Sequence, residues 1–158
     1  MQLRKAILIL SFLLFCLHGV QGQDSAQEPS IMRAKPLAVA DDDTPLKKLL
    51  TKRFNEALAE TQLTYKCTMQ GVPGEFSPID AGRRLQKAAV ELFAPKKAVS
   101  FLNQLLQYAN SLEKTAQAKL QRASQKSPMQ ALQLEIHRAR QFRLEIEIQK
   151  LKLETGVK

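Results

Sequence analysis

The chain has little cysteine, and its two thiols are Cys16 and Cys67. Cys16 lies in an N-terminal apolar run with the features of a cleaved leader, so processing would leave Cys67 alone. A single thiol excludes an internal disulfide, and stability must therefore come from packing. Cys67 is either an intermolecular bridge or reactive thiol, or a small half-buried apolar residue near a helix end. We favour the second interpretation.

The side-chain sets that carry catalysis or bind metals are also scarce. Beyond the leader the only histidine is His137, and a zinc or iron site requires several ligands at defined spacing. Gly71 and Gly74 are too few and wrongly spaced for a glycine-rich phosphate-binding loop. No serine lies in the tight glycine-flanked turn that holds the nucleophile of serine hydrolases. Glu145 and Glu147 project to different sides of a helix, so the two carboxylates cannot act together on one substrate. We therefore expect no enzyme activity, no catalytic, cofactor or metal-binding residues and no small-molecule substrate.

Long apolar runs are absent except at the N-terminus. Arg4 and Lys5 precede an apolar run over residues 6–17, and residues 20–22 form a plausible cleavage site. This order is typical of a secretory signal peptide, predicted here over residues 1–22, and the run is too short to span a bilayer. We expect an exported protein, periplasmic or else extracellular, whose mature chain does not span a membrane.

Acidic residues are fewer than basic ones, 15 against 24, which gives a formal charge of +9. Loss of Arg4 and Lys5 with the leader would lower this charge by two. The basic residues are scattered and interleaved with glutamate, and Glu91 and Glu113 lie in surface-like patterns. This arrangement favours a solvated helical surface over a polyanion site, and an exported chain is not expected to bind nucleic acid.

Residues 23–43 are predicted to be a disordered linker. They contain Pro29 and Pro36 and end in an acidic run at residues 41–43. The run lacks the alternating oxygen ligands and the glycine turn of a calcium loop. We interpret it instead as favourable negative charge at the N-terminus of the next helix.

From residue 44 onward, hydroxyl–proline pairs mark helix starts, because the hydroxyl caps the helix and proline fits its first position. The pairs are Thr44-Pro45, Ser77-Pro78 and Ser127-Pro128. Residues 71–74 form a loop, and Ala94-Pro95 is a break because proline disfavours helix in the preceding residue. The sequence therefore predicts four helices, at about residues 45–70, 78–93, 95–124 and 128–155.

The apolar spacing agrees with these bounds. In the first helix one face runs from Leu46 and Leu49 to Tyr65, and in the third a heptad-like seam runs from Ala98 to Ala123. The predicted fold class is all-α, with one domain over residues 44–155. We expect an elongated antiparallel helical bundle with a coiled-coil hairpin.

The last helix carries two apolar faces. Residues 142–153 alternate as a strand would, but the segment continues a helical pattern and is rich in helix-forming residues, so we favour helix. Leu144, Ile148 and Leu151 then cluster opposite the main apolar face, and we call these three residues the second stripe. The second stripe either packs beneath the first or second helix or forms an oligomer or partner surface.

The tract from Leu112 to Leu120, followed by Ser127, Leu132 and residues 135–151, resembles a helical hairpin of TolC-type outer-membrane efflux proteins. The order of segments is also similar to small exported bacterial helical proteins of unassigned function. The resemblance implies coiled-coil packing and a cell-envelope setting. It does not imply transport, because the chain offers no strands for a membrane barrel, and it carries over no functional residues.

Two functional hypotheses follow. The first is an exported, non-enzymatic interaction or scaffolding protein that uses the second stripe to dock on efflux-type hairpins, on another envelope protein or on itself. The alternative is a periplasmic holdase-type chaperone, because basic charge and a hairpin enclosing apolar surface would both suit the binding of unfolded proteins.

Overall fold

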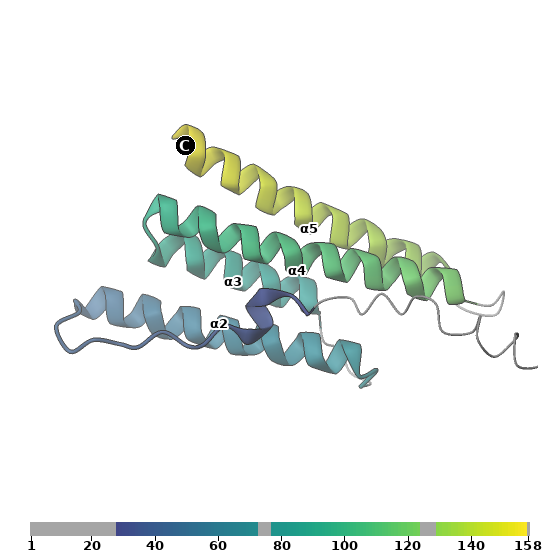
Figure 1. Cartoon of the computed structure of the whole chain (residues 1–158), viewed down its shortest axis with the longest axis horizontal. Coiled ribbons are helices and arrows are strands. Elements are labelled where there is room, and N and C mark those ends of the chain that lie inside the picture. Colours follow the sequence, from purple (N-terminus) through teal and green to yellow (C-terminus); the bar gives the residue numbers. More distant parts are fainter. Residues whose placement is uncertain (1–27, 73–76, 124–128, 158) are drawn as a thin grey trace, which may run out of the picture.

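The computed structural model describes residues 28–72, 77–123 and 129–157, and their regular structure is entirely helical. The elements are a short 3-10 helix, η1 (Ser30–Arg33), and the α-helices α2 (Pro45–Met69), α3 (Pro78–Leu92), α4 (Pro95–Arg122) and α5 (Met129–Thr155). Successive α-helices run antiparallel and form an elongated bundle (Figure 1). The predicted all-α fold is confirmed, and each helix end lies within two residues of its predicted place. The predicted leader at residues 1–22 and the Ser127-Pro128 cap lie outside the described residues.

Two of the predicted caps are present. The Thr44 hydroxyl accepts a hydrogen bond from the Lys47 amide at 3.2 Å, and the Ser77 hydroxyl accepts one from the Asp80 amide at 3.2 Å. A separate side-chain hydrogen bond between the Ser77 hydroxyl and the Asp80 carboxyl group is the main reason that the pKa of Asp80 is lowered. Each cap satisfies an amide that lacks an intrahelical partner, which fixes where α2 and α3 begin.

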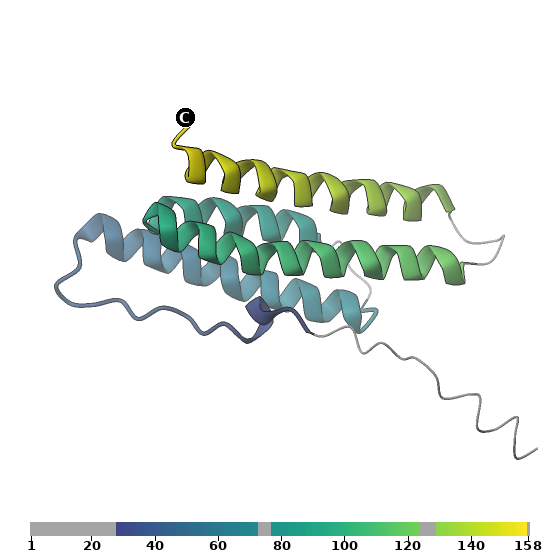
Figure 2. The same ribbon diagram turned by 45° about the horizontal axis from the view of Figure 1, so that its top comes forward.

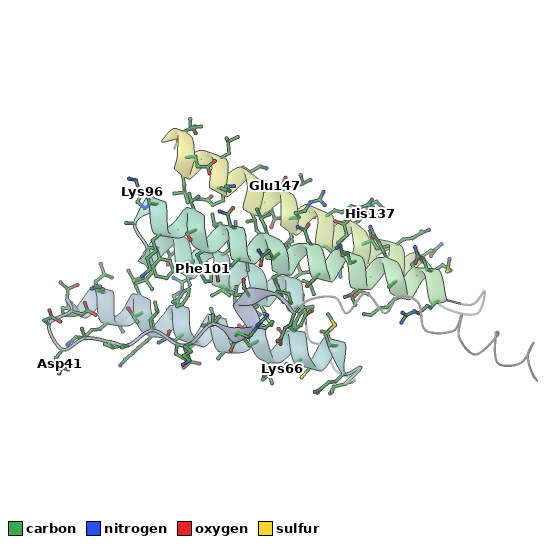
Figure 3. The ribbon with its side chains drawn as sticks, in the orientation of Figure 1. Asp41, Lys66, Lys96, Phe101, His137 and Glu147 are labelled. Atoms are coloured by element: carbon green, nitrogen blue, oxygen red, sulfur yellow. The ribbon has the colours of Figure 1, made fainter. Side chains whose placement is uncertain are left out.

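The core joins all four α-helices through large side chains. The predicted α4 seam is buried from Ala98 to Ala116. On α2, the Phe54 ring lies edge-on to Phe101 of α4, with centroids 5.2 Å apart, and Tyr65 lies 5.6 Å from Tyr108. Figure 3 labels Phe101, which lies on α4 toward the end of the bundle where α3 connects to α4. Such edge-to-face contacts add to the stability that burial itself contributes.

Residues 28–43 are not the disordered linker that the composition predicts. Ile31 is fully buried and Met32 is 7% exposed, and the segment continues alongside α2 (Figure 2). The side-chain amide of Gln62 donates to the carbonyls of Ile31 and Ala34 at 3.0 and 2.9 Å. Asn55 exchanges two hydrogen bonds with the Leu37 backbone. Polar side chains of α2 therefore satisfy part of the backbone of the segment, which allows it to pack with the short η1 as its only regular structure.

The start of α2 also differs from the prediction. Leu46 and Leu49, expected on the core face, are 67% and 65% exposed. Figures 1 and 2 show why: the first turns of α2 extend beyond the end of the bundle where α3 connects to α4. Periodicity identifies which face a residue is on but not whether another helix reaches that far along it.

Candidate protein-interaction site

The candidate site is on α5, which lies at the edge of the bundle remote from α2 (Figure 1). Residues 142–153 are helical, so the strand alternative is wrong. The helix ends at Thr155, before Gly156, whose φ of +69° is the left-handed conformation that commonly ends helices. Figure 3 labels His137 and Glu147 along α5.

The inner face of α5 packs against α4 and α3. Its four buried residues are between 0 and 8% exposed: Ile136, Ala139, Phe142 and Ile146. Phe142 reaches α3 at Gly82, where a Cβ atom would lie 2.6 Å from the ring Cζ. The lack of a side chain at Gly82 is therefore what allows the ring to lie directly on α3.

A buried carboxylate fixes α5 to α4. Glu113 is 8% exposed, and its two oxygens accept hydrogen bonds from Arg140 Nε at 2.7 Å and Arg143 Nη1 at 2.9 Å. Gln117 donates to the same carboxylate at 3.1 Å. The sequence placed Glu113 at the surface, and this interpretation was wrong. Two arginines one turn apart on α5 compensate the burial of its charge.

Further ion pairs fix the rotation of α5 about its own axis. Arg83 of α3 donates to both oxygens of Glu145, at 2.8 and 3.0 Å, and this pairing raises the pKa of Arg83. Near the other end of the helix, Nζ of Lys119 on α4 lies 3.1 Å from Oε1 of Glu135. A bidentate pair is geometrically specific. The polar contacts and the inner face therefore hold the opposite face of α5 away from the bundle.

That opposite face carries the second stripe. Leu144, Ile148 and Leu151 are 49%, 56% and 60% exposed, so the alternative that they pack beneath the first or second helix, here α2 and α3, is wrong. Ile148 also lines a groove of about 550 Å³ between α5 and α3, together with Val90 and mostly polar side chains. Among the described residues, no helix covers the second stripe.

The sequence interpretation missed Leu134, which is 50% exposed on the same side of α5. The signal that would have found it is spacing. Leu134 lies fourteen residues before Ile148, a separation of two heptads, which places both residues on one face of a helix. The exposed apolar face is therefore longer than the second stripe.

The other residues considered for catalysis or metal binding lie apart from one another. His137 is exposed on α5, and Cys67 is a free, half-buried thiol in the last turn of α2, where the sequence placed it. Among the described residues, no three histidine, cysteine, aspartate or glutamate side chains are grouped to hold a metal ion.

Within the same described residues, no helix combines the length and the apolar character needed to cross a membrane. Comparison with known proteins gave no match: neither a protein family, nor a curated protein, nor a solved structure is similar to this chain.

Proposed function

We propose that this chain is a non-enzymatic interaction protein that docks a helix of a protein partner on the outer face of α5. One observation carries the proposal: α5 is apolar on two opposite faces, and the bundle covers only one of them. The second stripe places three large aliphatic side chains, each about half exposed, within two turns of a rigid helix.

The energetics support a binding surface. Each exposed portion of Leu144, Ile148 and Leu151 contributes roughly 1 kcal/mol when a partner removes it from water. The polar contacts of Glu113 and Glu145 hold α5 in place before a partner arrives, so little ordering opposes association. Apolar side chains on a pre-organised helix, once a partner buries them, are the usual anchors of a contact between two helices.

We place this function in the cell envelope. The support is the leader pattern at residues 1–22, which predicts export, most simply to the periplasm. The resemblance to TolC-type hairpins favours a helical envelope component as the partner. Microscopy of the full chain fused to a reporter that is fluorescent in the periplasm tests the location, and retention of an uncleaved chain in the cytoplasm would contradict it.

Photo-cross-linking in living cells tests the interaction. A photoreactive amino acid in place of Ile148 is expected to yield a specific protein adduct. The matched control places it at Leu63, which is 61% exposed on α2. The adduct at residue 148 should disappear when Leu144 and Leu151 are changed to lysine. No adduct at residue 148, or equal adducts at both positions, would contradict the proposal.

A second candidate, a holdase-type chaperone, is favoured by the exposed leucines on α2. Leu46, Leu49 and Leu63 are 61–67% exposed, so apolar surface is distributed over two helices. A holdase would suppress aggregation of an unfolded acidic client, and added salt would weaken this effect because screening reduces attraction to the basic chain. Light scattering of the client with and without the chain distinguishes the two functions.

A further inference from the structure

A heptad frame of three repeats follows the exposed face of α5, and four of its seven core positions are apolar while three are polar. Its residues follow alternating steps of three and four, and all are exposed. This heptad seam consists of Leu134, His137, Gln141, Leu144, Ile148, Leu151 and Thr155. In coiled-coil notation Leu134, Gln141, Ile148 and Thr155 occupy a positions, and the others occupy d positions.

The two faces of α5 do not compete for the same residues. The buried inner residues Ile136, Ala139, Phe142 and Ile146 fall at b, c and f positions, on the side opposite the heptad seam. Figure 2 shows α5 lying along one side of the bundle, with no other described helix beyond it. A second helix can therefore pack on the heptad seam while α5 stays in its own bundle.

We propose that the partner on this face is a second copy of the chain, with the two α5 helices side by side and parallel. This inference rests on the proposed function and names its partner. The apolar layers support it, because Leu144 and Leu151 at d with Ile148 at a form the combination that favours two-stranded parallel coiled coils. In this arrangement each layer pairs a residue with itself, as a two-fold interface requires.

The charges beside the heptad seam select the parallel orientation. In a parallel pair each g position faces the e position of the following heptad on the other helix. Arg140 then faces Glu145 of the second copy, and Glu147 faces Lys152. Both contacts join opposite charges, and symmetry gives each of them twice. Arg140 and Glu145 already pair with Glu113 and Arg83 in their own chain. The side chains of Arg140, Glu145 and Glu147 are nevertheless 48%, 35% and 50% exposed, so each can make a further contact with the second copy.

An antiparallel pair would bring like charges together. With Leu144 opposite Ile148 of the second copy, Glu145 faces Glu145 and Glu147 faces Glu147. Arg138 also faces Lys152, and only Arg140 with Glu154 is complementary. Juxtaposed like charges disfavour this orientation.

Sedimentation equilibrium of protein purified from cells that express the full chain tests the dimer. We expect mass to rise with concentration from one copy to two. The double change Leu144→Glu and Ile148→Glu is expected to weaken association by at least about tenfold, because it places carboxylates in apolar layers. Leu49→Glu, at a similarly exposed leucine of α2, should leave association unchanged. Circular dichroism checks that every variant keeps its helix content.

Cysteine cross-linking tests the orientation. In a Cys67→Ser background, Ile148→Cys should form a disulfide-linked dimer under mild oxidation, because a positions face each other only in a parallel pair. Leu49→Cys is the control and should not form a disulfide-linked dimer. Cross-linking only between an Ile148→Cys chain and a Leu144→Cys chain would overturn the parallel arrangement.

The outcomes separate this inference from the proposed function. A strict monomer at high concentration, or a dimer unaffected by the double glutamate change, overturns the inference. If photo-cross-linking at residue 148 then still captures a different protein, the proposed function stands with another partner. A monomer without any adduct at residue 148 overturns both.

Discussion

The two faces of α5 carry similar side chains and have different surroundings. Ile146 is fully buried against the bundle, whereas Ile148, two residues later, is 56% exposed. Phe142 and Leu144 differ in the same way, at 0% and 49%. The inner face of α5 is packed in the bundle, and the outer face is exposed among the described residues. Hydropathy alone does not distinguish them, and the difference arises from what lies next to each face.

The largest expected effect comes from Phe142→Ala on the inner face. Removing this fully buried ring leaves a cavity between α4, α5 and α3. We expect the free energy of unfolding to fall by about 3–5 kcal/mol, as measured by urea denaturation. A change within error of wild type would mean that α5 is not held by its inner face.

Gly82→Ala changes the α3 side of the contact between Gly82 and the Phe142 ring. The new Cβ would meet the Phe142 ring at 2.6 Å, and overpacking of about 1–3 kcal/mol exceeds the gain in helix propensity of about 1 kcal/mol. We expect a net loss of unfolding free energy of up to about 2 kcal/mol. In a Phe142→Ala background the contact with the ring is gone and Tyr108 Cε1, 3.1 Å from the new Cβ, remains, so Gly82→Ala should there cost less stability than in the wild type. Additive effects in this double-mutant cycle would argue against the contact.

Glu113→Gln removes the buried charge while keeping its shape. The carboxylate accepts from Arg140 and Arg143, but both arginines are partly exposed, so water compensates part of the loss. We expect the free energy of unfolding to fall by about 1 kcal/mol. Glu154→Gln, at an exposed carboxylate paired only at 3.8 Å with Lys150, is the control and should change it by less than about 0.5 kcal/mol. Equal effects at the two sites would contradict the role of Glu113.

The smallest effect is expected on the outer face. Leu151→Gln replaces a side chain that is 60% exposed with one of similar helix propensity. The free energy of unfolding of the monomer in dilute solution should change by less than about 0.5 kcal/mol. A loss of several kcal/mol would show that Leu151 is covered within its own chain.

Much of the fold could be predicted from the sequence because its signals are local. The hydroxyl–proline pairs at Thr44 and Ser77 fix where α2 and α3 begin, and the seam from Ala98 to Ala116 identifies the buried face of α4. These features depend only on neighbours within a few turns of the same helix.

What escaped prediction depends on distant partners. Ile31 and Met32 form a short apolar pair between two prolines, and the Ile31 carbonyl accepts a hydrogen bond from Gln62, 31 residues away. Glu113 is separated from Arg140 by 27 residues, so nothing around it predicts burial. The second stripe was found from sequence because it is a property of one helix, but its exposure depends on the placement of α5 against α4.

The most direct test compares the unfolding free energies of Ile146→Ala and Ile148→Ala in dilute solution, where association does not contribute. The two changes remove the same atoms from the same helix. We predict a loss of about 2–5 kcal/mol for Ile146→Ala and less than about 0.5 kcal/mol for Ile148→Ala. Equal losses would contradict the assignment of stability to one face of α5 and association to the other.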